Sequence, residues 1–226
     1  VQALVLKEYN VRALLHTPDR RSLLPDGVEI AYGDVLDVDS LVDACVGVSV
    51  VVHLAAVIRE SGRFTFQHVN YEGTRNLLRA AVICGVGRFV YASTMGANSD
   101  AAIPYLYSRW MAEQEVSLSD VPSAVLRFSA GFGEGDGFFN LLAAQVKLFP
   151  MVPIVGDGQV RFQPIAADDM AMCLGYACVM DHLDGKTLDL GGPEYYTYDQ
   201  IVDLVAETLG VRISKVHIPI WLTGVG

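Results

Sequence analysis

Cysteine is scarce in this chain of 226 residues: Cys45, Cys84, Cys173 and Cys178 are its four copies, and no two of them form a Cys-x-x-Cys pair. That spacing argues against a disulfide framework or a thiolate metal site, and it favours buried thiols in a reducing compartment. The five histidines are scattered without ligand spacing. We interpret His53, inside the apolar run VVVHLAA, as a core or wall residue, and we expect no metal site.

Long apolar runs and basic clusters are also missing. Apolar residues make up 52% of the chain, yet no run reaches the roughly 18 uncharged apolar residues that a membrane-spanning helix needs. The net charge of −10 and the lack of a lysine or arginine stripe argue against nucleic acid or anionic lipid as the main partner. We therefore expect a soluble, cytoplasmic protein that binds small molecules or other proteins.

Strand-like and helix-like segments alternate regularly along the chain. Apolar strand-like segments cover residues 11–16, 28–37, 48–56, 88–93 and 123–129, and helix-like segments cover 39–47, 74–85, 138–149, 169–180 and 198–210, with a further helix from Pro104. This alternation predicts an α/β fold, a Rossmann-like doubly wound parallel sheet with helices on both faces. Because the pattern loosens near Phe128, we expect a nucleotide-binding domain over 1–128. A mixed segment over 129–226 should add a small C-terminal substrate lobe and further Rossmann elements.

Residues that directly follow the predicted strands are the first candidates for a binding site, because ligands of open parallel sheets collect at the carboxyl ends of the strands. These residues are Thr17, Pro18, Asp19, Arg20, Arg21, Gly33, Asp34, Val35, Ala55, Ala56, Ser93 and Thr94. Each also has an ordinary explanation. Asp34 could cap a turn, and Ser93 and Thr94 could bond to their own backbone.

The segment PYLYSRWMAE places Tyr105 four positions before Arg109. On a helix these side chains share one face, so the phenol and the guanidinium could point at one ligand, and the cation would favour the phenolate. The alternative interpretation is an ordinary amphipathic helix with an exposed tyrosine and an exposed arginine.

Seven segments together resemble the extended and atypical branches of the short-chain dehydrogenase/reductase superfamily, the NAD-dependent epimerases and dehydratases. They are GDVLDVDSL, VVHLAA, HVNYEGTRNLLRAA, FVYASTMGA, YxxSR, LRFSAGFGEGD and RFQPIAADDMA. The most specific motif is Asn-x-x-Gly-Thr-x-Asn, at Asn70, Gly73, Thr74 and Asn76. Within the superfamily, ASTMGA, YLYSR, FFNLLAAQVKLFP and IVGDGQVRFQPI look like the NAD(P)-binding accessory subunit of respiratory complex I and its bacterial relatives.

The resemblance implies a Rossmann domain that binds NADP or NAD and acts on a small molecule. Tyr105 would exchange a proton with the substrate oxygen, Thr94 with Ser93 would supply the orienting hydroxyl, and Arg109 stands where the family has lysine. The implied cofactor-binding residues are His16, Arg20, Arg21, Asp34, Val35, Ala55, Ala56, Asn70, Tyr105 and Arg109. Asp34 would face the adenine, with Ala55 and Ala56 beside the ribose.

Three features bear on these roles. Arginine keeps the charge of lysine but reaches and hydrogen-bonds differently. The Gly-x-x-Gly-x-x-Gly loop of the family does not occur in residues 1–16, so we expect it and its strand upstream. His16-Thr17 replaces the acid of NAD-preferring relatives, and Arg20-Arg21 follows, which favours NADP.

Two functions stay open at this point. One is an NAD(P)-dependent oxidoreductase or epimerase/dehydratase. The other is a catalytically weak, nucleotide-loaded structural or redox-sensing subunit that docks on a larger respiratory complex and is peripheral to the membrane. In the C-terminal part, Arg161 and Gln163 are candidates for the substrate-side wall, and Asp168 and Asp169 are expected to cap a helix.

Overall fold

The computed structural model describes residues 1–219 and 221, and they fall into two compact units. Unit 1 comprises Val1–Arg127 and Ala171–Asp189, and unit 2 comprises Phe128–Met170 and the described residues from Leu190 onward. The chain thus leaves unit 1 after Arg127 and returns to it for one segment. Each unit has its own hydrophobic core.

The described strands of unit 1 form two sheets, and both contain predicted parallel pairs. Strand β3 (Val50–His53) pairs in parallel with β4 (Arg88–Thr94), and the order continues through β5 (Ser123–Phe128) to β10 (Lys186–Leu190). A second parallel pair joins β1 (Arg12–Leu15) to β2 (Glu29–Tyr32), and within the described residues it shares no ladder with the first sheet. Strands β2 and β3 are shorter than their apolar segments, so Gly33, Asp34, Ala55 and Ala56 lie in loops at the carboxyl ends of these strands.

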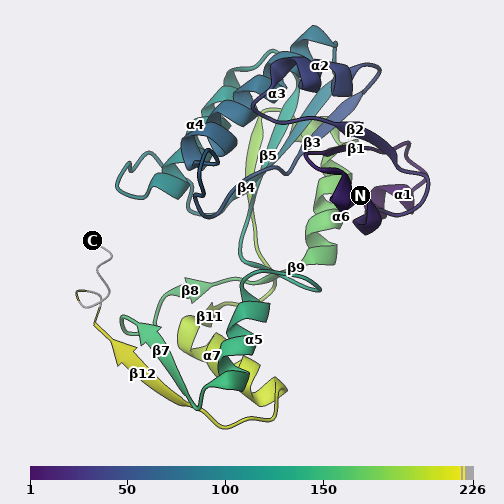
Figure 1. The fold of residues 1–226 in the computed structure, drawn as a ribbon. Helices are drawn as coiled ribbons and strands as arrows, with labels where there is room; N and C mark the ends of the chain where they lie inside the picture. The colour runs from purple at the N-terminus through teal and green to yellow at the C-terminus, as the bar shows by residue number, and fades with distance from the viewer. Residues whose placement is uncertain (220, 222–226) are drawn as a thin grey trace. The chain divides into compact units, whose positions relative to one another are not determined.

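Three helices cover one face of this sheet: α2 (Val38–Cys45), α3 (Gly73–Ile83) and α4 (Pro104–Leu118). Figure 1 shows them along one side and α6 (Ala167–Ala177) along the other. Proline suits the first position of α4 because it lacks only an N–H that would be unsatisfied there. Their apolar faces meet β4 and β5 in a core that contains Leu41, Leu77, Phe89, Val116 and Val125.

Short helical segments complete unit 1. They are α1 (Gln2–Val5), the 3-10 helices η1 (Pro18–Leu23) and η3 (Asp181–Leu183), and the π-helix η2 (Phe66–Glu72) that leads directly into α3. A π-helical turn is uncommon and is often found at functional sites. This one buries Val69 and Asn70.

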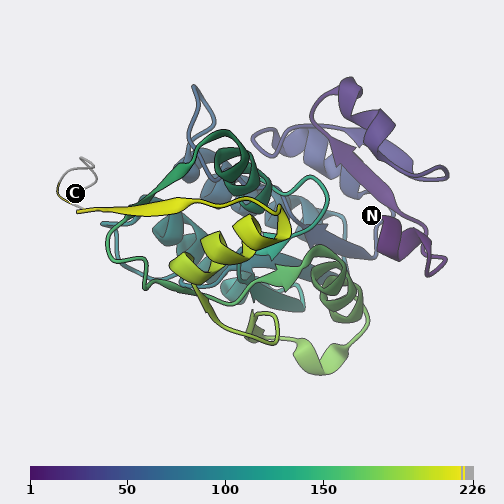
Figure 2. The ribbon, with the colours of Figure 1, turned by 90° about the horizontal axis from the view of Figure 1, so that it is seen from below.

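Unit 2 is built around helices α5 (Phe139–Leu148) and α7 (Tyr198–Thr208), which pack together with a parallel pair of strands, β7 (Met151–Val155) and β12 (Ser214–Ile218). Figure 2 shows α7 and β12 from below. Two further pairs join β8 (Arg161–Phe162) to β11 (Tyr196–Thr197) and β6 (Gly131–Phe132) to β9 (Ile165–Ala166). The core is apolar and includes Leu142, Val146, Ile154, Ile201 and Val202.

Every helix within residues 1–219 and 221 is too short or too polar to cross a bilayer. In the same part of the chain, no three His, Cys, Asp or Glu side chains come together in a way that could hold a metal ion. Cys45 is buried, as its apolar surroundings predicted, whereas Cys84, Cys173 and Cys178 are half-buried.

Candidate cofactor and proton-transfer site

Arg109 lies inside unit 1 and not on its surface. The side chain is 4% exposed, it donates a hydrogen bond to the Ala92 carbonyl at the end of β4, and its guanidinium carbon lies 4.8 Å from the centre of the Tyr91 ring. Its Nε and Nη1 atoms are buried and have no hydrogen-bond partner among the described residues. The interpretation of Arg109 as an exposed side chain of an amphipathic helix is therefore wrong.

Arg109 also lacks a counter-ion in the described part of the chain. Burial raises the pKa of the neighbouring Tyr91 to about 12, so that phenol is neutral at physiological pH. The carboxylate of Glu113, one turn further along α4, is occupied by Arg127. Within the described residues, the charge of Arg109 thus has no counter-ion, and its Nε and Nη1 donor atoms have no hydrogen-bond partner.

Tyr105 lies in the first turn of α4, one turn before Arg109, and is half-buried. Its ring packs edge-on against Phe66 of the π-helix, with ring centres 5.6 Å apart. The backbone carbonyl of Tyr105 accepts a hydrogen bond of 2.7 Å from Ser108. The turn that carries the phenol is therefore held from both sides.

Asn70 connects this turn to the loop after β3. It is fully buried, its amide oxygen accepts from the Val57 N–H at 2.8 Å, and its amide nitrogen donates to the Val57 carbonyl and to the Ser108 hydroxyl, both at 3.1 Å. Asn70 was expected to contact the cofactor. The structure shows that its side-chain groups fix the loop that contains Ala55 and Ala56 against α4.

The two predicted hydroxyls have different environments. Ser93 is buried and donates a 2.5 Å hydrogen bond to Glu113, which a bidentate pair with Arg127 holds at 2.9 and 2.6 Å. Thr94 is half-buried, and its hydroxyl makes one long contact of 3.5 Å to the Met95 carbonyl. Of the two, Thr94 has the hydroxyl that is more available to a ligand.

His53 closes the base of the site at the end of β3. It is buried, its ring stacks on Tyr91, and its Nε2 lies 2.9 Å from the Thr74 hydroxyl. Because the Thr74 hydroxyl donates to the Asn70 carbonyl, His53 must be the donor, through Nε2–H. Burial and, to a smaller extent, the Arg109 charge lower the pKa of His53 to about 3, so the imidazole is neutral. It serves as the core or wall residue that its apolar run predicted.

The residues that were expected to bind the adenosine lie at the carboxyl ends of β1 and β2. The Asp34 carboxylate accepts from the Leu36 N–H at 3.0 Å and from Arg63 at 2.9 Å, and His16 lies 3.7 Å from it. Val35 packs so closely on Gly73 that a Cβ there would lie 2.9 Å from a Val35 methyl group.

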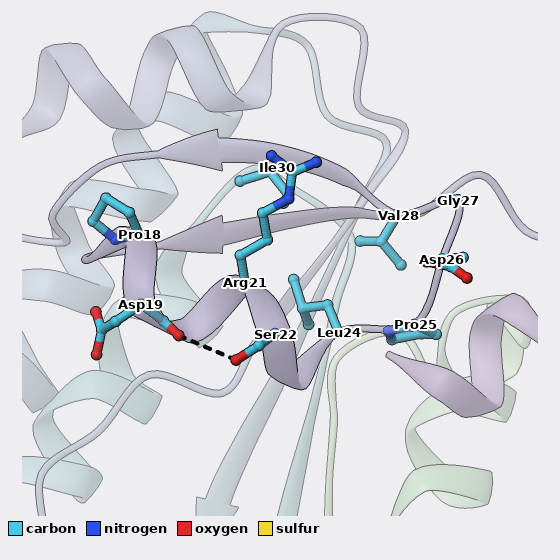
Figure 3. A pocket seen from close by; sticks show the side chains of 10 residues that line it. All are labelled: Pro18, Asp19, Arg21, Ser22, Leu24, Pro25, Asp26, Gly27, Val28 and Ile30. Carbon is cyan, nitrogen blue, oxygen red and sulfur yellow. Dashed lines mark hydrogen bonds between the residues drawn. The ribbon is translucent and has the colours of Figure 1, made fainter.

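Arg20 and Arg21 lie on η1, exposed, and neither forms an ion pair with the described residues. Arg21 lines a cavity of about 550 Å³ between η1 and β2, whose apolar lining includes Leu24, Val28 and Ile30 (Figure 3). The structure thus brings His16 and Asp34 together but leaves both arginines outside that contact.

Sequence reasoning missed three charged residues of this region: Arg63, Glu113 and Arg127. The spacing of Glu113, four after Arg109 and eight after Tyr105 on one helix, could have placed it on the same face. Nothing in the local pattern distinguished Arg63 from the other polar residues of its loop.

The predicted substrate-side residues lie in unit 2. Gln163 donates to the Gly192 carbonyl at 2.6 Å, and the Arg161 guanidinium lies over the Tyr195 ring. Asp168 and Asp169 lie in the first turn of α6, where the helix dipole stabilises negatively charged side chains.

Comparison with known proteins shows what this chain is similar to. Residues 9–105 match the 3-beta hydroxysteroid dehydrogenase/isomerase family. The mitochondrial NADH dehydrogenase [ubiquinone] 1 alpha subcomplex subunit 9 of Arabidopsis thaliana is 28% identical over 189 residues, which are 82% of this chain and 47% of that protein. The resemblance to the short-chain dehydrogenase/reductase superfamily is confirmed.

The similar proteins also include an enzyme. Ceramide reductase of Caulobacter vibrioides is 26% identical over 196 residues, 85% of this chain and 60% of that protein. The chain spans about half the length of the NADH dehydrogenase subunit that it matches.

Solved structures of the superfamily confirm the Rossmann-like fold. MoeE5 in complex with UDP-glucose and NAD has a TM-score of 0.81 at 23% identity, over 96% of this chain and 80% of that chain. The UDP-glucose 4-epimerase of Thermus thermophilus in complex with NAD also has a TM-score of 0.81, at 21% identity, over 96% of this chain and 81% of that chain.

Proposed function

We propose that this chain carries the NAD(P) site and the proton-transfer residues of an oxidoreductase or epimerase/dehydratase that acts on a small molecule. The observation that carries the proposal is Arg109: a buried cation with two unpaired donor atoms and no counter-ion among the described residues. Buried polar groups are normally hydrogen-bonded, so unpaired donors point to an oxygen-rich ligand. The ribose hydroxyls of a dinucleotide fit that requirement.

In this proposal, separate residues bind the cofactor, exchange the proton and orient the substrate. Arg109, anchored on Ala92, binds the ribose and lies one helical turn from Tyr105. Tyr105 exchanges the proton with the substrate oxygen, and the Thr94 hydroxyl orients that oxygen. The nicotinamide supplies or accepts the hydride when it is bound. Asn70 and Ser108 keep the tyrosine turn in place.

A second candidate is a nucleotide-binding structural or redox-sensing subunit. Two observations favour it: the similarity to the NADH dehydrogenase subunit, and arginine in the place of the family's lysine. In this role the protein docks on a larger respiratory complex, is peripheral to the membrane through that complex, and holds NADPH or NADH without turning it over. As a free-standing enzyme it is cytoplasmic.

Variants at the two key positions test the proposal. Tyr105→Phe should lower the rate of carbonyl reduction by about 10² to 10⁴, the usual contribution of general acid catalysis, while NADPH affinity stays within about twofold. Arg109→Met should weaken NADPH binding at least about tenfold, because it removes a charged donor to the ligand. It should not lower the free energy of unfolding, because the unpaired donors cost stability. Calorimetry, chemical denaturation and a panel of ketone and nucleotide-sugar substrates measure these quantities.

Tyr107→Phe is the matched control, since Tyr107 stacks on Trp110 of the same helix. NADPH binding without turnover of any substrate supports the second candidate. Failure of the protein to bind either dinucleotide would contradict both candidates.

A further inference from the structure

The loop that follows β3 in the chain contacts the residues that directly follow β1 and β2. Arg63, in this loop, donates to the Asp34 carboxylate at 2.9 Å, and His16 lies 3.7 Å from the same oxygen. The Phe64 ring packs edge-on against His16, with centres 5.9 Å apart, and lies 5.1 Å from the Arg63 guanidinium carbon. Two basic side chains and an aromatic ring thus surround one carboxylate.

The Arg63 guanidinium contacts Asp34, but most of the side chain is accessible. The Asp34 side chain is 19% exposed and held by the Leu36 N–H, and the Arg63 side chain is 63% exposed. The Arg63 carbonyl contacts the His68 ring at 3.0 Å, and a bridge between Ser61 and Phe64 closes the loop. Only one guanidinium nitrogen, Nη2, contacts Asp34. The other donors of the planar fork are left for a second anion.

We propose that Arg63 binds the phosphate on the adenosine ribose of NADP, and so selects NADP over NAD. This inference rests on the proposed function. The group that distinguishes the two cofactors lies at the carboxyl end of the second strand of a Rossmann sheet, where an arginine can accommodate the phosphate. In this chain the corresponding strand is β1, which His16 follows. Arg63 is the cation that lies beside the same Asp34 oxygen as His16.

Arginine suits this task because its fork can pair with a carboxylate on one edge and a phosphate on another. Asp34 holds the guanidinium in position in advance, which lowers the ordering cost of binding. Arg20 and Arg21 are the neighbours along the chain, but Arg21 lies over the cavity between η1 and β2 (Figure 3).

Dissociation constants for NADPH and NADH, measured by calorimetry at fixed salt on the purified protein, test the inference. Arg63→Met should weaken NADPH binding about 10- to 100-fold, the range of one charge-assisted pair, and leave NADH binding within about twofold. Arg59→Met is the control, an exposed arginine in the same loop, and it should change neither constant. A variant with both Arg20→Gln and Arg21→Gln tests the competing assignment.

The outcomes separate this inference from the proposed function. Equal weakening of NADPH and NADH by Arg63→Met would overturn it, as would selective loss of NADPH binding in the Arg20/Arg21 variant alone. A protein that binds NADH but not NADPH would overturn the inference and leave the proposed function standing. Loss of both cofactors in the unmodified protein would remove the proposed function, and the inference with it.

Discussion

Unit 1 and unit 2 differ in what they bury. Unit 1 buries nine polar or charged side chains: His53, Asn70, Thr74, Arg88, Ser93, Ser108, Arg109, Glu113 and Ser123. The described part of unit 2 buries none, and its core is aliphatic. Burying such groups costs free energy unless they are hydrogen-bonded, so a chain with this network needs it for more than packing.

The contrast agrees with the proposed location of the site in unit 1. In unit 1 a connected part of these groups lies near the ends of β3 and β4 and on α4: Asn70 bonds to Ser108 beside the Tyr105 turn, and Arg109 bonds to the Ala92 carbonyl. In unit 2 the polar pairs, such as Lys215 with Asp203, lie at the surface. The first unit holds a buried polar network, and the described core of the second is apolar.

The largest test of this difference is removal of a buried partner. Arg127→Met leaves the Glu113 carboxylate, 3% exposed, without its cation, and we expect a loss of about 3–5 kcal/mol in the free energy of unfolding. In unit 2, Lys215→Met breaks a close pair with Asp203, which is 61% exposed, and a longer contact of 3.8 Å with Asp199, which keeps its contact with His217. The expected loss is about 1 kcal/mol. Urea denaturation compares the two variants. Equal losses would remove the distinction between the units.

A pH series tests the same idea with a neutral buried group. The pKa of His53 is about 3 in the folded protein, below the value of about 6.5 in an unfolded chain, so acid protonates the unfolded state first. Its contribution to stability is present above pH 6.5 and is lost as the pH falls toward 3. Between pH 7 and pH 4 we expect a loss of about 3 kcal/mol from this residue.

The variant His53→Asn isolates that contribution, because asparagine does not titrate. Its free energy of unfolding, measured by denaturation at pH 7, 5.5 and 4, should fall less steeply than that of the unmodified protein, by about 3 kcal/mol over the range. Parallel curves would show that His53 is protonated without cost, contrary to its burial.

Helix caps provide the smallest effect and should not distinguish the units. Thr197 accepts from the Gln200 N–H in a capping box at the start of α7, and Asp37 accepts from two N–H groups at the start of α2. Thr197→Ala and Asp37→Ala should each cost about 1 kcal/mol, since both caps are local and solvent-exposed. Thermal unfolding of both variants checks this equality. A much larger cost in unit 1 would mean that its stability depends on more than the buried network.

Much of the fold could be predicted from local patterns. The apolar run that contains His53 predicted a strand of a parallel sheet, and β3 pairs in parallel with β4, with its three valines half-buried. Pro104 and the residues after it predicted α4, and the four-residue spacing placed Tyr105 and Arg109 on that helix. These features follow from steric preferences and periodicities that act over a few residues.

The site itself was only partly predictable. The motifs identified Thr94, Tyr105 and Arg109 as candidates, but not the burial of Arg109 or the engagement of Ser93 by Glu113. Ser93 and Glu113 are twenty positions apart, and Arg63 and Asp34 are twenty-nine apart. No spacing rule connects such pairs, because the path of the intervening chain decides whether they meet.

By itself, the sequence determined an α/β chain with a parallel sheet and a tyrosine and an arginine on one helix, because each of these depends on neighbours along the chain. The tertiary structure decided that Arg109 is buried with donors to spare, that Asn70 ties a loop to the tyrosine turn, and that Arg63 reaches Asp34. Desolvation and hydrogen bonding act between groups that are close in space, so these properties exist only once the chain has folded.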